Sequence, residues 1–119
     1  MRDKTDIALT EMFSGSTRIA KKVGANAAIV HERIAFYILE NKKNNRNLYE
    51  GRYWTYLSYE DLSNYIGFLT PKAVRTAVQK LKDANLVTTG HFNQLAADHT
   101  NWYTIDEKIL TLAYPKLIQ

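Results

Sequence analysis

The sequence predicts an α+β fold, mainly α-helical, with a small antiparallel β-sheet. Helical hydrophobic periodicity and helix-capping residues recur along most of the 119-residue chain. Short aromatic or β-branched segments bounded by turn residues indicate a few strands. The length fits one domain, and a hydrophobic content of 45% is enough for one modest core.

The N-terminal part predicts an arm followed by two helices. Residues 1–15 have weak periodicity, so we expect an arm. Ser16 caps a short helix through Val23, which Gly24 ends. Asn26 is then the expected N-cap of a longer helix. Its apolar stripe consists of Val30, Ile34, Tyr37 and Ile38.

The middle of the chain predicts a strand and a brief helix. A polar loop over residues 41–51 leads into residues 53–57, where aromatic and β-branched residues alternate as in a strand. Ser58 is followed three residues later by Asp61, a pattern similar to a capping box. It begins a short helix, Tyr59–Ile66, which a glycine ends.

A second start signal, Thr70 followed by Pro71, predicts the next helix. We expect this helix to run to about Ala84, with Asn85 as its C-cap. Its apolar face is formed by Val74, Ala77, Val78, Leu81 and Ala84.

The C-terminal part predicts a β-hairpin and a last helix. Residues 86–92 and 100–105 are the expected strands, and residues 93–99 form a loop longer than a tight turn. Asp106 caps a short helix that Pro115 halts. Two helices with a short connection therefore precede a hairpin, which is the plan of a winged helix-turn-helix domain spanning residues 16–119.

The polar face of the helix that begins at Pro71 predicts binding to double-stranded DNA. The chain has a net charge of +4 and a pI near 9.3, which favours a polyanionic partner. From Thr70 to Lys82 every charged residue is Lys or Arg. Lys and Arg neutralise phosphates, while Arg, Gln and Thr also contact base edges. The expected major-groove residues are Lys72, Arg75, Thr76 and Gln79, and the expected backbone contacts on this helix are Lys80 and Lys82.

Further DNA contacts are expected from two neighbouring segments. Around the preceding short helix they are Ser58, Tyr59, Ser63 and Thr70, and in the basic loop they are Lys42, Lys43 and Arg46. Each has an ordinary structural alternative: Ser58 serves as a cap, and the loop is a solvated turn. A single-strand stacking platform of Tyr53, Trp54 and Tyr56 is a weaker alternative to a half-buried strand.

Catalytic and metal-binding patterns are missing from the sequence. The absence of cysteine excludes disulfides, thiolate zinc sites and cysteine nucleophiles. The three histidines lack metal-site spacing, and there is no nucleophile elbow or phosphate-binding glycine loop. We therefore expect no enzyme, no metal and no cofactor. Without a signal or membrane segment, we expect a cytoplasmic protein.

Four blocks resemble the N-terminal winged-helix domain of replication initiators, or replisome organisers, of Gram-positive phages and plasmids, which is DnaD-like. The blocks are residues 24–30, 54–62, 70–81 and 98–105. The resemblance covers residue 16 to about residue 112, and it implies origin-DNA binding with replication proteins as partners. That family carries a further C-terminal domain, whereas this chain stops at Gln119. A transcriptional repressor and a copy-number or partition regulator are therefore alternatives.

The expected wing departs from the family. It carries Gln94-Leu95-Ala96-Ala97 in place of basic residues, so it adds little phosphate affinity. We expect this small apolar tip to contact a second subunit in a homodimer. A protein-protein interaction module that uses the same surfaces is the alternative from a different class.

Overall fold

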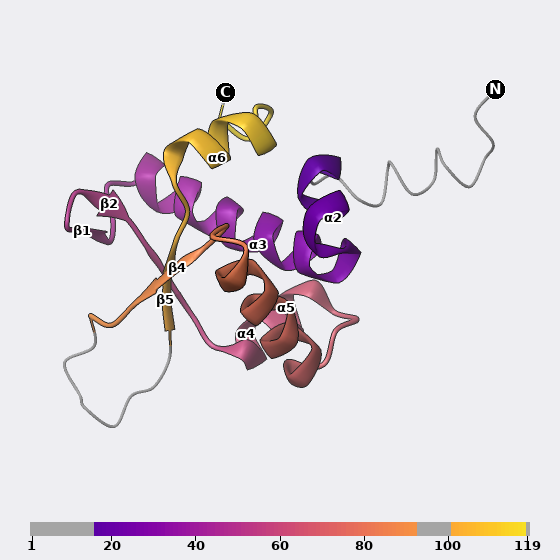
Figure 1. Cartoon of the computed structure of the whole chain (residues 1–119). Coiled ribbons are helices and arrows are strands. Elements are labelled where there is room, and N and C mark those ends of the chain that lie inside the picture. Colours follow the sequence, from indigo (N-terminus) through magenta and orange to yellow (C-terminus); the bar gives the residue numbers. More distant parts are fainter. Residues whose placement is uncertain (1–15, 93–100, 119) are drawn as a thin grey trace.

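The computed structural model describes residues 16–92 and 101–118, which form an α+β domain of helices packed beside small antiparallel sheets (Figure 1). Its helices are α2 (Thr17–Val23), α3 (Ala25–Lys43), α4 (Tyr59–Ile66), α5 (Pro71–Asp83) and α6 (Glu107–Ala113). Its strands are β1 (Leu48–Tyr49), β2 (Arg52–Tyr53), β3 (Thr55–Leu57), β4 (Thr88–Gly90) and β5 (Asn101–Thr104). The prediction of a mainly helical α+β fold is confirmed. The expected arm and the expected wing tip lie outside the described residues.

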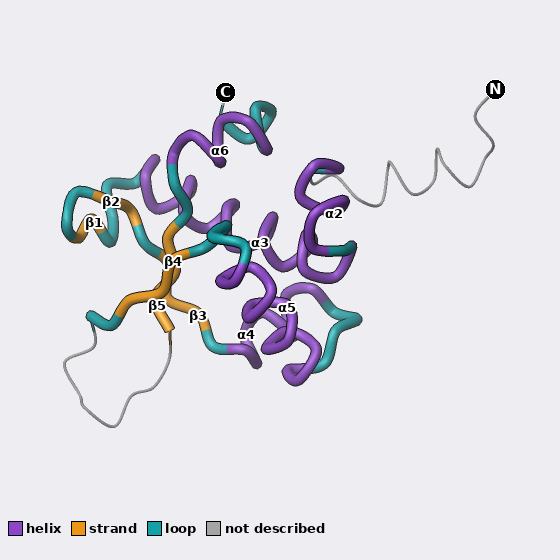
Figure 2. The backbone as a smooth tube through the Cα atoms, in the orientation of Figure 1, coloured by secondary structure: helices purple, strands orange, loops and turns teal. Residues whose placement is uncertain are grey.

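The larger sheet has three strands in the order β3-β5-β4, all antiparallel (Figure 2). Tyr103 of the central strand β5 is paired with Thr55 on one side and with Thr89 on the other. β4 follows α5 directly in the chain, and β3 precedes α4. The helix pair α4–α5 is therefore inserted between two strands of one sheet, which fixes its position relative to that sheet.

The long helix α3 lies at the centre of the core and packs against α2, α4, α5 and β2, β3 and β5. Its Val30 and Ile34 are fully buried. The predicted apolar face of α5 is confirmed over Val74, Ala77, Val78 and Leu81, whereas Ala84 is only partly buried. Burial of this face against α3 leaves the polar face of α5 outward, as the periodicity predicts.

Three predicted helix starts are confirmed by their caps. Ser16 accepts a hydrogen bond from the Ile19 amide, and Thr70 accepts one from the Ala73 amide. Ser58 and Asp61 form a complete capping box. The predicted cap Asn26 is wrong. Gly24, with a φ of 89°, ends α2 through its N–H and begins α3 through its carbonyl, so no separate capping residue fits between the two helices.

The predicted polar loop over residues 41–51 is also wrong in part. α3 continues through Lys43, and β1 and β2 then form a small hairpin. Both residues at its turn, Glu50 and Gly51, have positive φ values of 54° and 75°. This is the backbone of a type I′ hairpin turn, for which Glu is an unusual first residue. The predicted strand over residues 53–57 is likewise interrupted at Trp54, between β2 and β3.

The segments after α5 largely match their predictions. α5 has Ala84 as its C-cap, and the expected cap Asn85 follows it in the left-handed conformation with a φ of 58°. Asp106 caps α6 by accepting a hydrogen bond from the Lys108 amide. Over the described ranges, none of the helices is both long and apolar enough to cross a bilayer.

Candidate nucleic-acid interface

The outward face of α5 carries the residues expected to contact DNA. Pro71 at the first helical position and the Thr70 cap fix where α5 begins. The side chains exposed along it are Lys72, Arg75, Thr76, Gln79, Lys80 and Lys82. The structure thus brings the six expected contacts of this helix onto one accessible surface.

Two of these side chains hydrogen-bond within α5. The Thr76 hydroxyl donates to the Lys72 carbonyl at 3.2 Å, and the Gln79 amide nitrogen donates to an Asp83 carboxylate oxygen at 2.9 Å. Both hydrogen bonds are exposed to solvent, so replacing either with a hydrogen bond to water or to a ligand costs little free energy.

A groove of about 580 Å³ runs between α5 and the junction of α2 with α3. Its lining from α5 includes Lys72, Thr76 and Lys80, and its lining from the junction includes Val23 and Asn26. None of the described residues that line it is acidic. We call this feature the α2–α5 groove. Across it, side chains of α5 face the junction of α2 with α3.

Sequence reasoning did not include α2 in the interface, yet α2 is strongly basic. It carries Arg18, Lys21 and Lys22 and no acid, and all three cations are exposed. α5 carries four cations and one acid, Asp83, at its last residue. The pair Lys21-Lys22, close before Gly24, was the sequence signal that could have placed α2 in the interface. Its meaning depended on knowing that the end of α2 lies beside α5.

The expected contacts around α4 have partners within the fold. Ser58 Oγ accepts from the Asp61 amide at 2.9 Å, as part of the capping box. Ser63 Oγ donates to the Leu69 carbonyl at 2.5 Å, which braces the turn between α4 and α5. The Tyr59 hydroxyl accepts from the Asn101 side-chain amide at 3.5 Å. Their contact with phosphates stays a prediction.

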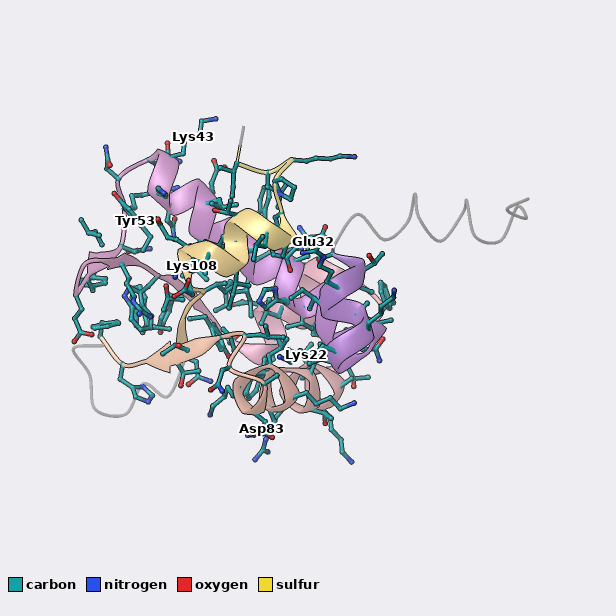
Figure 3. The ribbon with its side chains drawn as sticks, turned by 45° about the horizontal axis from the view of Figure 1, so that its top comes forward. Lys22, Glu32, Lys43, Tyr53, Asp83 and Lys108 are labelled. Carbon is teal, nitrogen blue, oxygen red and sulfur yellow. The ribbon has the colours of Figure 1, made fainter. Side chains whose placement is uncertain are left out.

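The basic loop is not brought together with α5. Lys42 and Lys43 lie in the last turn of α3, whereas the α2–α5 groove lies at its first turn. A 19-residue helix separates its ends by about 28 Å. Figure 3 shows Lys22 and Lys43 far apart in the molecule. Lys42 also forms an ion pair with Glu107 at 2.8 Å. Arg46, exposed beyond the end of α3, belongs to the same remote region.

The aromatic residues of the strands form a packed cluster, which consists of Tyr49, Trp54, Tyr56, Phe92 and Trp102. Tyr49 stacks on Phe92 with ring centroids 4.7 Å apart, and the Trp54 indole N–H donates to the Tyr49 carbonyl at 3.0 Å. Trp54 is 4% exposed, so its faces are covered by protein. The cluster therefore holds the β1–β2 hairpin against β4 and β5 and does not present Trp54 for stacking.

The two histidines that the structure describes, His31 and His91, do not share a site. His31 is fully buried, with Nε2 bonded to the Leu86 carbonyl at 2.8 Å and Nδ1 bonded to the Tyr114 hydroxyl. Burial lowers the pKa of His31 from 6.5 to about 4, although the Leu86 hydrogen bond partly opposes this. His91 is exposed near the end of β4, and His99 lies outside the described residues. His31 is thus a neutral structural group of the core.

Comparison with known proteins gives no relative: no family model, no curated protein and no solved structure matches the chain.

Proposed function

We propose that this chain is a winged helix-turn-helix protein that binds double-stranded DNA, with α5 in the major groove. The order of elements supports this proposal. α4 and α5 are joined by residues 67–70, and the antiparallel pair β4–β5 follows, with β3 paired to the other edge of β5. This is the order in which a helix-turn-helix precedes a wing.

The observation that carries the proposal is the division of α5 into a buried apolar face and an exposed basic face. Val74, Val78 and Leu81 anchor the helix in the core. The opposite face presents four cations, together with Thr76 and Gln79 as hydrogen-bonding groups. The helix is roughly 20 Å long and fits a groove about 12 Å wide. Such a face supplies both phosphate neutralisation and base contacts.

We further propose a role in replication initiation or maintenance of a phage, a plasmid or another mobile element. The resemblance to replication initiators supports it, and its blocks coincide with the start of α3, with β3 and α4, with α5 and with β5. A transcriptional repressor and a copy-number or partition regulator share the same DNA-binding unit. The bound sequence separates them: repeated sites point to an origin, and a single site at a promoter points to repression.

Selection of bound duplexes from a random library tests the assignment of α5. We expect Arg75→Ala and Gln79→Ala to lose about 1–3 kcal/mol of discrimination at particular base pairs, because these side chains contact base edges. Lys82→Ala is the control on the same helix, and it should weaken binding to all sequences alike. Circular dichroism should show that the three variants keep the parent's helix content. An Arg75→Ala variant with the parent's affinity and preferences would contradict the assignment.

A protein-interaction module is the second candidate, and one observation favours it. Leu112, Leu117 and Ile118 of the C-terminal segment are exposed, and Leu117 and Ile118 line a groove of about 410 Å³ with Phe36 and Leu39 of α3. Exposed apolar side chains that lie together suit a protein partner. The homodimer stays a prediction, since the wing tip expected to form it lies outside the described residues.

A further inference from the structure

We propose that the α2–α5 groove holds a backbone phosphate of the bound duplex, beside the base pairs that α5 contacts. This inference rests on the proposed function and makes it more specific. It divides the exposed face of α5 into a row for the DNA backbone and a row for the bases, and it moves Lys72 and Thr76, which the sequence assigned to the bases, into the backbone row with Lys80.

The spacing along α5 defines the two rows. Lys72, Thr76 and Lys80 are four residues apart and all line the groove. Residues at this spacing lie one above the other on a helix, so they form a single edge that faces α3. Arg75 and Gln79 are exposed but do not line the groove, so they form the neighbouring row, which contacts the bases. Lys82, which is also exposed outside the groove, stays a backbone contact at the end of the helix.

The chemistry of the groove suits an anion. On one side, Lys72 and Lys80 supply ammonium groups, and Thr70 and Thr76 supply hydroxyls. On the other side lies the C-terminal end of the basic helix α2, where Lys21 and Lys22 precede the lining residue Val23. Because the described lining contains no acid, the cations of the two helices add to one positive electrostatic potential at the groove. A volume of about 580 Å³ is ample for a phosphodiester and its adjoining sugar.

Geometry favours the backbone over the bases as the occupant of the groove. The groove lies at the flank of α5, between that helix and the body of the protein. A helix in the major groove has a phosphate strand along each flank, and the base edges lie beneath its tip and its outer face. Lys72 and Lys80 are therefore assigned to one strand of the backbone.

Asn26→Asp tests this inference, since it adds one negative charge inside the groove without touching α5. Asn26 is exposed in the first turn of α3, where a carboxylate interacts favourably with the helix dipole, so folding should be unharmed. We expect about tenfold weaker binding to a fluorescent mixed-sequence duplex of about 20 base pairs, and a salt dependence shallower by about one ion. Thr111→Asp, an exposed position on α6, is the control with the same net charge.

Duplexes in which one phosphate is replaced by an uncharged methylphosphonate identify the phosphate that the groove contacts. In duplexes with single methylphosphonate substitutions, at least one position should cost the parent affinity but cost Asn26→Asp clearly less, since the variant has already lost that contact. If the parent binds DNA with steep salt dependence while Asn26→Asp and Thr111→Asp bind alike, the groove proposal is overturned and the proposed function stands. A parent that does not bind duplex DNA overturns both.

Discussion

His31 shows how one residue ties three parts of the chain together. It lies on α3, and its ring bonds to the Leu86 carbonyl after α5 and to the Tyr114 hydroxyl after α6. A carbonyl only accepts hydrogen bonds, so Nε2 carries the proton and Nδ1 accepts from Tyr114. Protonation of Nδ1 would reverse that hydrogen bond, with the Tyr114 hydroxyl accepting, and would place a positive charge in the core, where burial disfavours it. The buried ring is therefore stable only in its neutral form.

The stability of the protein should consequently fall in mild acid. The pKa of His31 is about 4 in the folded protein and 6.5 in the unfolded chain, so the unfolded chain binds the extra proton first. The contribution of neutral His31 to the free energy of unfolding is fully present above pH 6.5. It is lost as the pH falls toward 4, which lowers the free energy of unfolding by about 3 kcal/mol. Urea unfolding at a series of pH values measures this loss.

His31→Gln provides the comparison for that experiment. It should be less stable than the parent at pH 7, because the buried contacts are disturbed. Between pH 6.5 and pH 4, however, its free energy of unfolding should fall by about 3 kcal/mol less than the parent's. Equal pH dependence in the two proteins would show that His31 is not held neutral by the fold.

At the scale of elements, features set by local contacts were predictable from the sequence, and features that depend on long-range contacts were not. Ser58 and Thr70 were recognised as caps because each bonds to an amide three residues away. The β1–β2 hairpin was missed because its turn begins with Glu50, and because its support comes from Tyr49 stacking on the distant Phe92. No local pattern encodes such a contact.

The candidate site divides in the same way. Helical periodicity predicted which side chains of α5 are exposed, since the buried face of a helix follows from its own sequence. It did not distinguish the row at Lys72 from the row at Arg75, because that distinction depends on where the junction of α2 and α3 lies. For the same reason, the basic residues of α2 were missed and the remote Lys43 was included.

The packing of the aromatic cluster can be tested at Gly90 of β4. A Cβ atom at this position would lie 3.0 Å from the Trp54 ring and 3.1 Å from the Phe92 ring, both closer than normal contact. Because Trp54 is buried and cannot easily move, Gly90→Ala should lower the free energy of unfolding by about 1–3 kcal/mol. Denaturant titration measures this change. Thr88→Ala, at an exposed position on β4, should change it by less than about 0.5 kcal/mol.

At the scale of the whole molecule, α3 separates two different surfaces. Its first turn borders the basic region of α2 and α5, and its last turns border the groove that contains Leu117 and Ile118, whose lining mixes apolar side chains with Glu40, Lys42 and Lys43. A DNA-binding protein should use the first surface and leave the second for a partner. Which of them dominates binding decides between the two candidate functions.

The salt dependence of duplex binding tests the central claim most directly. About four phosphate contacts predict a slope near −3.6 for the logarithm of the binding constant against the logarithm of salt concentration, which is about a tenfold loss for each doubling of salt. Fluorescence anisotropy with a mixed-sequence duplex measures that slope. We expect the parent to show this steep loss. No binding at low salt, or binding that salt leaves unchanged, would contradict the account of α5 as a DNA-binding helix.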